Sequence, residues 1–201
     1  MALIARGGRK FVGLSAIVSA SSLPFFVPLS AAFACLTVFF AAVFRDPPRE
    51  IGRGIVSPAD GTVREVDGAK GLVSIYLALR NVHVTRNPLD ATVVKAVRVR
   101  GGHMPAFSKS TPSNERVEIE LSTAIGDISV VEMTGAIARR IVPYIEPGQP
   151  LAKGDKLSLI RFGSRVDIHM PPDQVRILAR KGQRLYAGKT CIAEVVDGPV
   201  D

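Results

Sequence analysis

The sequence predicts a mainly β domain, a sandwich or barrel-like fold with one or two short helices, behind an apolar N-terminal hairpin. Three observations support this prediction. No charged residue occurs from Phe11 to Phe44. From Ile51 onward, short segments rich in β-branched residues follow one another, several of them alternating with a period of two. Clusters of Gly, Pro, Asn and Asp separate these segments, as turns do.

The apolar run is longer than one straight helix needs to cross a hydrocarbon core of about 30 Å. Pro24 and Pro28 divide it into halves near 11–22 and 29–44. Cationic residues flank both ends: Arg6, Arg9 and Lys10 before it, and Arg45, Arg49 and Arg53 after it. Positive flanks tend to stay cytoplasmic. We therefore expect a hairpin or re-entrant anchor on the cytoplasmic side of the cell membrane, rather than a cleaved signal peptide, whose apolar region would be shorter.

The composition favours a membrane partner over nucleic acid. The 201-residue chain carries a formal net charge of +8, which suits either partner. It has no Trp and three Tyr, and no basic patch interleaved with aromatic residues for stacking bases. Cys35 and Cys191 are far apart and lack metal-ligand spacing, so neither a disulfide framework nor a metal site is expected. A lipoprotein signal at Cys35 is disfavoured because the apolar run continues past it.

Two domains follow from this pattern: an anchor and stiff linker over 1–50 and a β domain over 51–201. In the β domain, the sequence from 134 to 145 is the best candidate for a helix. Eight segments are expected to be strands: 63–66, 72–79, 92–99, 117–121, 128–133, 156–162, 165–170 and 192–196.

Few residues in the β domain could carry chemistry. His83 precedes a proline turn, His103 lies in a Gly-Pro loop, and His169 belongs to an expected strand. On that strand, His169 and Asp167 alternate onto the face opposite Ser164, which makes them poor partners for its hydroxyl. The Gly-Ser pair lacks the second glycine of a nucleophile elbow.

Four segments in order resemble the phosphatidylserine decarboxylase family in its short form, which includes archaetidylserine decarboxylases. They are VSPADGTV (56–63), NVHVTRNP (81–88), SNER (113–116) and FGSRVD (162–167). Each has a structural explanation when taken alone, such as a turn at Asp60 or a strand bulge at Gly163 and Ser164. Their joint occurrence in this order is specific to the family. The resemblance covers nearly the whole chain, including the N-terminal apolar segment.

The resemblance implies a proenzyme that cleaves itself between Gly163 and Ser164. The products would be a β chain (1–163) and an α chain (164–201), which stay together as a heterodimer. Ser164 would become a covalent pyruvoyl group, so no external cofactor is implied. Glycine before the serine makes physical sense, because it has no Cβ to obstruct attack by the hydroxyl. By the same resemblance, His83 would be the base and Asp60 would orient it.

The resemblance also implies the reaction. The pyruvoyl ketone would form a Schiff base with the amine of phosphatidylserine, a membrane lipid, and decarboxylation would give phosphatidylethanolamine. Four arginines are candidates for holding the phosphodiester: Arg86, Arg116, Arg139 and Arg140. Two positions depart from the long-form pattern, since Arg86 stands where a second histidine is usual and Arg165 where threonine is common.

A second hypothesis is a membrane-tethered, non-catalytic module similar to lipoyl or biotinyl carrier domains. The turn and strand over 146–161 suggest it. A carrier needs a modifiable lysine, usually beside methionine, whereas Lys153 and Lys156 flank a Gly-Asp turn. An inactive member of the decarboxylase family is a third possibility. A carrier stays one chain and the enzyme becomes two, so chain number separates them.

Overall fold

The fold is known from a computed structural model that describes residues 3–102, 113–135, 140–161 and 164–196. The chain divides into two compact units, Met1–Pro48 and Arg49–Asp201. The first unit is helical and the second is built from antiparallel strands.

The N-terminal unit is a helical hairpin of α1 (Arg9–Ser22) and α2 (Val27–Val43). Pro28 lies in the first turn of α2, where its missing N–H costs no helical hydrogen bond. The helices have 14 and 17 residues, and no helix in the described part of the chain is long and apolar enough to cross a membrane. The sequence thus located the two helices, while the expected membrane role of the hairpin receives no support from helix length.

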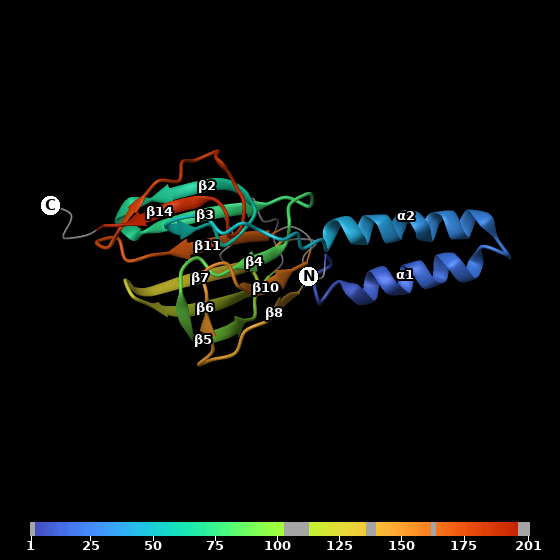
Figure 1. Ribbon diagram of the computed structural model, residues 1–201, viewed down its shortest axis with the longest axis horizontal. Helices are drawn as coiled ribbons and strands as arrows, with labels where there is room; N and C mark the ends of the chain where they lie inside the picture. The colour runs from blue at the N-terminus through green and yellow to red at the C-terminus, as the bar shows by residue number, and fades with distance from the viewer. Residues whose placement is uncertain (1–2, 103–112, 136–139, 162–163, 197–201) are drawn as a thin grey trace. The chain divides into compact units, whose positions relative to one another are not determined.

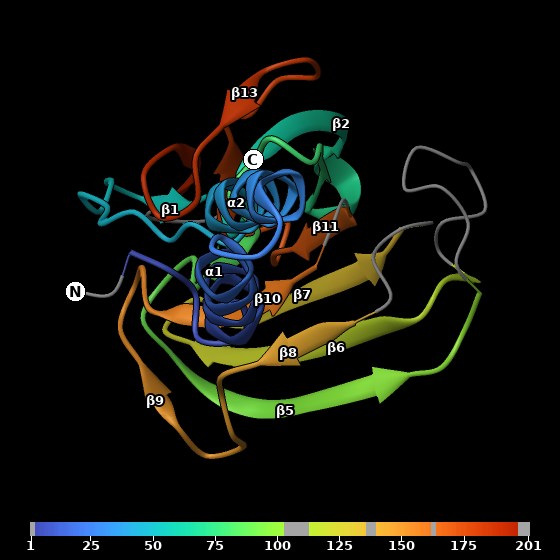
Figure 2. The same ribbon diagram turned by 90° about the vertical axis from the view of Figure 1, so that its right-hand side faces the viewer.

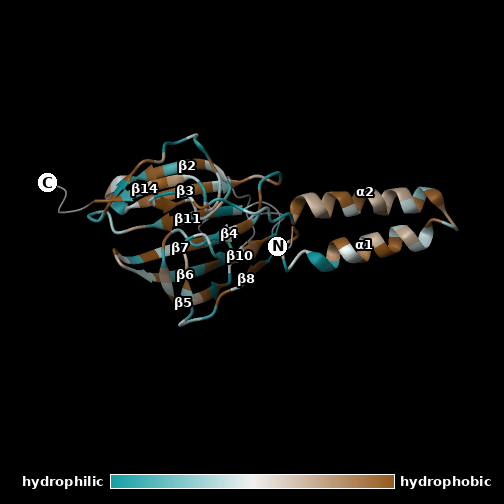
Figure 3. Ribbon diagram, viewed as in Figure 1, coloured by the Kyte–Doolittle hydropathy of each residue, from teal (hydrophilic) through white to brown (hydrophobic). Residues whose placement is uncertain are grey.

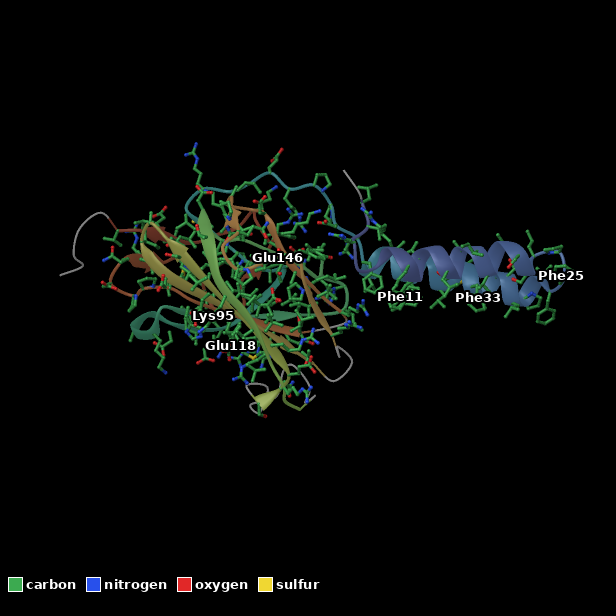
Figure 4. The ribbon with its side chains drawn as sticks, turned by 90° about the horizontal axis from the view of Figure 1, so that it is seen from below. Phe11, Phe25, Phe33, Lys95, Glu118 and Glu146 are labelled. Carbon is green, nitrogen blue, oxygen red and sulfur yellow. The ribbon has the colours of Figure 1, made fainter. Side chains whose placement is uncertain are left out.

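Hydroxyl groups line the seam between the two helices. Thr37 donates to the Oγ of Ser15 at 2.9 Å. Ser19 and Ser30 donate reciprocally to each other's carbonyl oxygens at 2.9 and 2.8 Å. Aromatic side chains also lie between the helices, because the ring centroid of Phe11 in α1 is 5.7 Å from that of Phe40 in α2 and 5.6 Å from that of Phe44. Figure 3 shows apolar residues along both helices, and Phe25, labelled in Figure 4, is 86% exposed. The seam is therefore partly polar and partly aromatic, and large apolar side chains are exposed outside it.

The second unit contains three antiparallel sheets. The largest has the strand order β13-β2-β3-β11-β7-β6-β5-β9, and most of this order can be followed in Figure 1. Its strands are β2 (Gly61–Asp67), β3 (Leu72–Leu77), β5 (Ala91–Val99), β6 (Arg116–Thr123), β7 (Gly126–Thr134), β9 (Pro150–Leu151), β11 (Ser164–His169) and β13 (Arg184–Leu185).

Two three-stranded sheets complete this unit. One, in the order β4-β10-β8, lies within the curve of the large sheet, as seen in Figure 2. The other has the order β1-β14-β12. The strands are β4 (Val84–Arg86), β8 (Ile141–Pro143), β10 (Lys156–Ile160), β1 (Ile55–Val56), β12 (Val175–Ile177) and β14 (Cys191–Val195). A 3-10 turn, η1 (Gly68–Lys70), follows β2.

Each of the eight predicted segments overlaps a strand, which confirms the mainly β prediction. The helix predicted over 134–145 is wrong, because Thr134 ends β7 and Ile141–Pro143 forms β8. Ile141 is buried in the core and pairs with Ile160 of β10. Tertiary pairing has overridden the local helical preference there.

One face of the large sheet forms the core. Residues that oppose one another across antiparallel strands share a face. The row through β6, β7, β11 and β3 therefore places fully or nearly fully buried apolar residues together: Val117, Ile119, Leu121, Ile128, Val130, Val166, Ile168, Val73, Ile75 and Leu77. The β4-β10-β8 sheet adds Leu157 and Ile160 to the same cluster. This face also carries Ser164.

Candidate functional site

Ser164 is the first residue of β11, in the middle of the large sheet. It pairs with Leu77 of β3 on one side and Thr134 of β7 on the other. Pairing continues regularly to His169, so β11 contains no bulge. Ser164 is fully buried, and its hydroxyl has no hydrogen-bond partner among the described residues. A buried hydroxyl without a partner costs about 1–3 kcal/mol, which favours a functional role over a structural one.

His83 immediately precedes β4 and is fully buried. Its carbonyl oxygen accepts a hydrogen bond from the backbone N–H of Ile160 at 3.0 Å. Ile160 ends β10, and the chain reaches Ser164 four residues later. The fold thus brings His83 beside the segment that leads into the Gly-Ser pair. Of that pair, Gly163 lies outside the described residues.

Asp60 lies directly before β2 and is buried. Its carboxylate accepts hydrogen bonds from Nη2 of Arg49 at 3.1 and 2.9 Å and from the backbone N–H of Ala187 at 2.8 Å. The guanidinium of Arg49 also lies over the ring of Tyr186, 5.9 Å from its centroid. The expected orientation of His83 by Asp60 stays a prediction, while Arg49 is a partner that sequence reasoning missed.

The predicted arginines are placed in different surroundings. Arg86 is buried in β4 and donates to the carbonyl oxygen of Gly154 at 3.0 Å. Arg116 opposes Met133, which opposes Arg165, so the register puts Arg116 on the face of the sheet away from Ser164. Its Nε donates to Glu118 at 2.6 Å. The structure does not bring Arg86 or Arg116 together with Ser164.

Arg140 lies nearer to the approach to Ser164, and Arg139 lies outside the described residues. The exposed Arg140 accepts a hydrogen bond through its carbonyl oxygen from the N–H of Arg161 at 3.2 Å. Arg161 directly follows β10. Burial lowers the pKa of Arg161, and the positive charge of Arg140 lowers it further. Arg161 is a second residue that sequence reasoning missed.

Of the other residues considered, Asp167 accepts a hydrogen bond from Nε of Arg165 at 2.8 Å, on the face opposite Ser164. His103 lies outside the described residues. Cys35 is exposed, Cys191 is partly buried, and both are free thiols. Within the described ranges, no three His, Cys, Asp or Glu side chains are grouped so that they could hold a metal ion.

Comparison with known proteins identifies the family of the chain. The family model for phosphatidylserine decarboxylase matches residues 36–193, most of the chain. This protein belongs to the phosphatidylserine decarboxylase family.

Several relatives within the decarboxylase family are similar over most of their length. The phosphatidylserine decarboxylase proenzyme of Streptomyces avermitilis is 46% identical over 154 residues, which cover 74% of this chain and 71% of the relative. Proteins named as archaetidylserine decarboxylase proenzymes are also similar. That of Methanosarcina mazei is 36% identical over 205 residues, which cover 96% of this chain and 97% of the relative. That of Halobacterium salinarum is 40% identical over 190 residues, which cover 92% of this chain and 95% of the relative.

One further polar residue of this decarboxylase lies under the site. Glu132 of β7 is fully buried on the core face, two residues before Thr134. Its Oε1 lies 2.6 Å from the hydroxyl of Thr85 and its Oε2 lies 2.5 Å from that of Ser158, both within hydrogen-bond distance. Burial raises the pKa of Glu132 to about 7, although the two hydroxyl hydrogen bonds act in the opposite direction. The sequence could have predicted this burial, because alternation along the strand at 128–133 puts Glu132 on the same face as the apolar Ile128 and Val130.

Proposed function

We propose that this protein decarboxylates phosphatidylserine to phosphatidylethanolamine with a pyruvoyl group that it makes from Ser164. The observation that carries the proposal is the fully buried, partnerless hydroxyl of Ser164, at the start of β11 and downstream of the strand that His83 contacts. The family and the relatives named phosphatidylserine decarboxylase proenzyme support the same reaction.

Self-cleavage begins with attack of the Ser164 hydroxyl on the carbonyl carbon of Gly163. The peptide bond is exchanged for an ester, and the nitrogen of Ser164 is released as an amine. A base must take the hydroxyl proton, and His83 is the group we assign to it. Loss of the α-proton and breakage of the Cβ–O bond then release residues 1–163 as a carboxylate. The remaining dehydroalanine becomes a ketone when its imine form is hydrolysed and ammonia leaves.

The position of Ser164 suits a pyruvoyl group, which must be held in one orientation and kept away from water. A pyruvoyl ketone formed at residue 164 would supply the electron sink that decarboxylation of an amino acid headgroup requires. The residues of the chain itself hold and orient the reacting residue. Leu77 and Thr134 flank the reacting residue, and the surrounding core excludes water. His83 is the candidate that returns a proton to the product carbon.

The two product chains stay associated because of the sheet order. After cleavage β10 ends the β chain, whereas β11, β12, β13 and β14 belong to the α chain. β11 pairs over its full length, Ser164–His169, with β3 on one side and β7 on the other, both in the β chain. Separation would break both ladders in the middle of the core. The proposed mature protein is therefore a tight heterodimer.

The helical hairpin suits a lipid surface on the cytoplasmic side of the cell membrane. Its exposed residues near the turn are apolar, with Phe25 86%, Val27 63% and Phe26 59% exposed. Its hydroxyls face inward along the seam, an arrangement that lets helices pack where the surroundings are apolar. Arg6, Arg9, Lys10 and Arg45 lie in sequence at its open end, where phosphate headgroups would meet them. Insertion into one leaflet needs no helix that crosses the bilayer.

The mass of the purified full-length chain tests the function. We expect two chains, 1–163 and 164–201, with the second beginning in a pyruvoyl group, and CO2 release from phosphatidylserine vesicles. Ser164→Ala should stay one chain. Ser74→Ala is the matched control, because Ser74 is another buried serine in the large sheet whose hydroxyl has no partner among the described residues. An uncleaved wild-type chain in the presence of lipid would point instead to the carrier-like module or an inactive homologue.

A further inference from the structure

Glu132 places a carboxyl group inside the hydrophobic core, behind the proposed site. It opposes Val117 of β6 and Val166 of β11, and none of its surface is exposed. Such a group is costly to bury unless its hydrogen bonds are complete. The proposed mechanism makes no use of it, so its presence needs a reason.

Three oxygen-to-oxygen contacts form a closed ring around this carboxyl group. Oε1 of Glu132 lies 2.6 Å from the hydroxyl of Thr85, and Oε2 lies 2.5 Å from that of Ser158. The two hydroxyls are 3.0 Å from each other. Thr85 and Ser158 oppose each other across β4 and β10, so the ring joins that sheet to β7.

The number of available hydrogens shows whether ionised or neutral Glu132 can make all three contacts of the ring into hydrogen bonds. Each hydroxyl supplies one hydrogen, so an ionised Glu132 leaves two hydrogens for three contacts. A neutral carboxylic acid supplies the third, because its own O–H can donate to Ser158, Ser158 to Thr85, and Thr85 back to the carbonyl oxygen of Glu132. Burial acts in the same direction, raising the pKa of Glu132 to about 7. A carboxylic acid held neutral in an apolar site can serve as a hydrogen-bond donor.

Two titratable residues lie close in sequence to the ring. His83, directly before β4, is two residues before Thr85, and Lys156, the first residue of β10, is two residues before Ser158. On β6 and β11 the residues facing Glu132 are Val117 and Val166, which carry no charge.

The ring joins three strands that lie beside the parts of the proposed reaction. Thr85 lies on β4, which His83 directly precedes. Ser158 lies on β10, which leads to Gly163. Glu132 lies on β7, which pairs with β11, two residues before Thr134, the residue opposite Ser164. The ring therefore ties β4 and β10 to the strand that pairs with β11.

We propose that Glu132, Thr85 and Ser158 form a positioning ring that aligns His83 and the end of β10 with Ser164, and that Glu132 acts in this ring as a neutral acid. The inference rests on the proposed self-cleavage. It makes the alignment depend on pH: the ring is complete while Glu132 is protonated, as at pH 6, and it opens when Glu132 loses its proton. Because cleavage leaves β10 and β11 on separate chains, the ring also holds β10 in register afterwards.

The test is the rate of self-cleavage of the full chain across pH 6 to 9 for wild type and Glu132→Gln. A glutamine amide accepts and donates as a neutral acid does, without a titratable proton. We expect equal rates at pH 6. Above about pH 7 the wild-type rate should fall roughly tenfold per pH unit, while the E132Q rate should not. Glu132→Ala should cleave slowly throughout, and Val130→Ala, on the same strand and face, should keep the wild-type pH profile.

Identical pH profiles for wild type and E132Q overturn the proposal, as does slow cleavage by E132Q at pH 6 or wild-type cleavage by E132A. If E132Q does not fold, the self-cleavage rates of two Thr85 variants provide the test. Thr85→Ser keeps the hydroxyl and should cleave normally, whereas Thr85→Val should not; equal rates for these two variants overturn the positioning role.

A second measurement separates this inference from the proposed function. If wild type never cleaves, the function fails, but the ring can still be tested by thermal unfolding in a Ser164→Ala background. The folded pKa of about 7 lies above the ordinary value of 4.5. The stabilisation is therefore complete below pH 4.5 and is lost as pH rises through about 7. The melting temperature should fall between pH 6 and 9 with Glu132 present, and fall less with E132Q; equal falls overturn the neutral ring.

Discussion

Nη2 of Arg49 lies 2.9 Å from Oδ2 and 3.1 Å from Oδ1 of Asp60, and both side chains are nearly buried. Arg49 lies near the end of the linker, and Asp60 directly precedes β2, the strand next to β3. The contact therefore fixes the start of the β unit to the aspartate that the family resemblance places in the site. The remaining described partner of the carboxylate is the N–H of Ala187, which belongs to the proposed α chain. Asp60 thus joins the two proposed product chains.

Replacement of Arg49 by methionine should reduce stability and self-cleavage together. Asp60 would keep a buried charge with one backbone N–H as its described partner, and removing one member of a buried ion pair costs about 3–5 kcal/mol. We expect a loss near 3 kcal/mol in the free energy of unfolding, measured by urea denaturation in a Ser164→Ala background, and self-cleavage at least tenfold slower.

Arg53→Met is the matched control for Arg49→Met. It removes the same charge four residues further along the chain, but Arg53 is exposed. Exposed substitutions usually change stability by less than about 0.5 kcal/mol. If R49M and R53M behave alike, the Arg49–Asp60 pair has no role in the site.

Replacement of His83 by glutamine should slow self-cleavage by about 10²–10⁴-fold, the usual effect of losing a general base. Glutamine fills much of the imidazole volume and leaves β4 in place. The measurement is the fraction of cleaved chain against time. Val82→Ala, a change at the neighbouring buried residue, controls for packing. Cleavage by H83Q at the wild-type rate would assign the base to another group.

Addition of a methyl group at Gly61 should disturb the strand that Asp60 precedes. A Cβ built on Gly61 would lie 2.3 Å from the carbonyl oxygen of Tyr76 and 2.7 Å from Cγ2 of Ile75, both on β3. The backbone of β2 must therefore move away, and overpacking of this kind costs about 1–3 kcal/mol.

Gly68→Ala is the comparison for Gly61→Ala, since nothing lies within 4 Å of a Cβ at Gly68. Denaturation of both variants in the Ser164→Ala background measures stability, and the cleavable forms give rates. We expect G61A to lose about 2 kcal/mol and to cleave slowly, and G68A to match wild type. Equal stability of the two variants would mean that the close approach of β2 to β3 can relax without cost.

The long strands of this fold could be predicted because each has enough residues to show alternation. β3, β5, β6, β7 and β11 all fall on predicted segments. Strands such as β1, β9 and β13 have two residues each, too few to show any period. The segment at Ile141–Pro143 resembled a helix because of its composition, and its pairing with β10 depends on a partner distant in sequence.

The site could be predicted only as far as motifs extend. Asp60, His83 and Ser164 belong to recognisable motifs, and the fold places each of them at the start of a strand or directly before one. Arg49 and Glu132 belong to no motif. Their roles follow from contacts with residues 11 to 47 positions away in sequence, and no local pattern encodes such pairs.

Introduction of a charge at the tip of the hairpin tests its proposed lipid contact. Phe25 is 86% exposed and lies at the turn between α1 and α2, as Figure 4 shows. Burial of a phenylalanine side chain in an apolar phase contributes about 1.5–3 kcal/mol, and a carboxylate adds a cost of its own. Phe25→Glu should therefore weaken binding to vesicles by at least about tenfold. Flotation with vesicles of phosphatidylcholine and phosphatidylglycerol in equal amounts measures this binding.

Leu79→Glu is the control for the hairpin, because Leu79 is an exposed apolar residue of the β unit. It introduces the same charge outside the hairpin and should leave vesicle binding unchanged. If F25E binds as wild type while L79E does not, the β unit carries the membrane contact and the hairpin has another partner. If both bind as wild type, the basic residues suffice, and binding should then disappear in high salt, since electrostatic attraction to an anionic surface is screened. Loss of binding by F25E alone, persisting in high salt, is the result expected of a hairpin that enters the apolar layer.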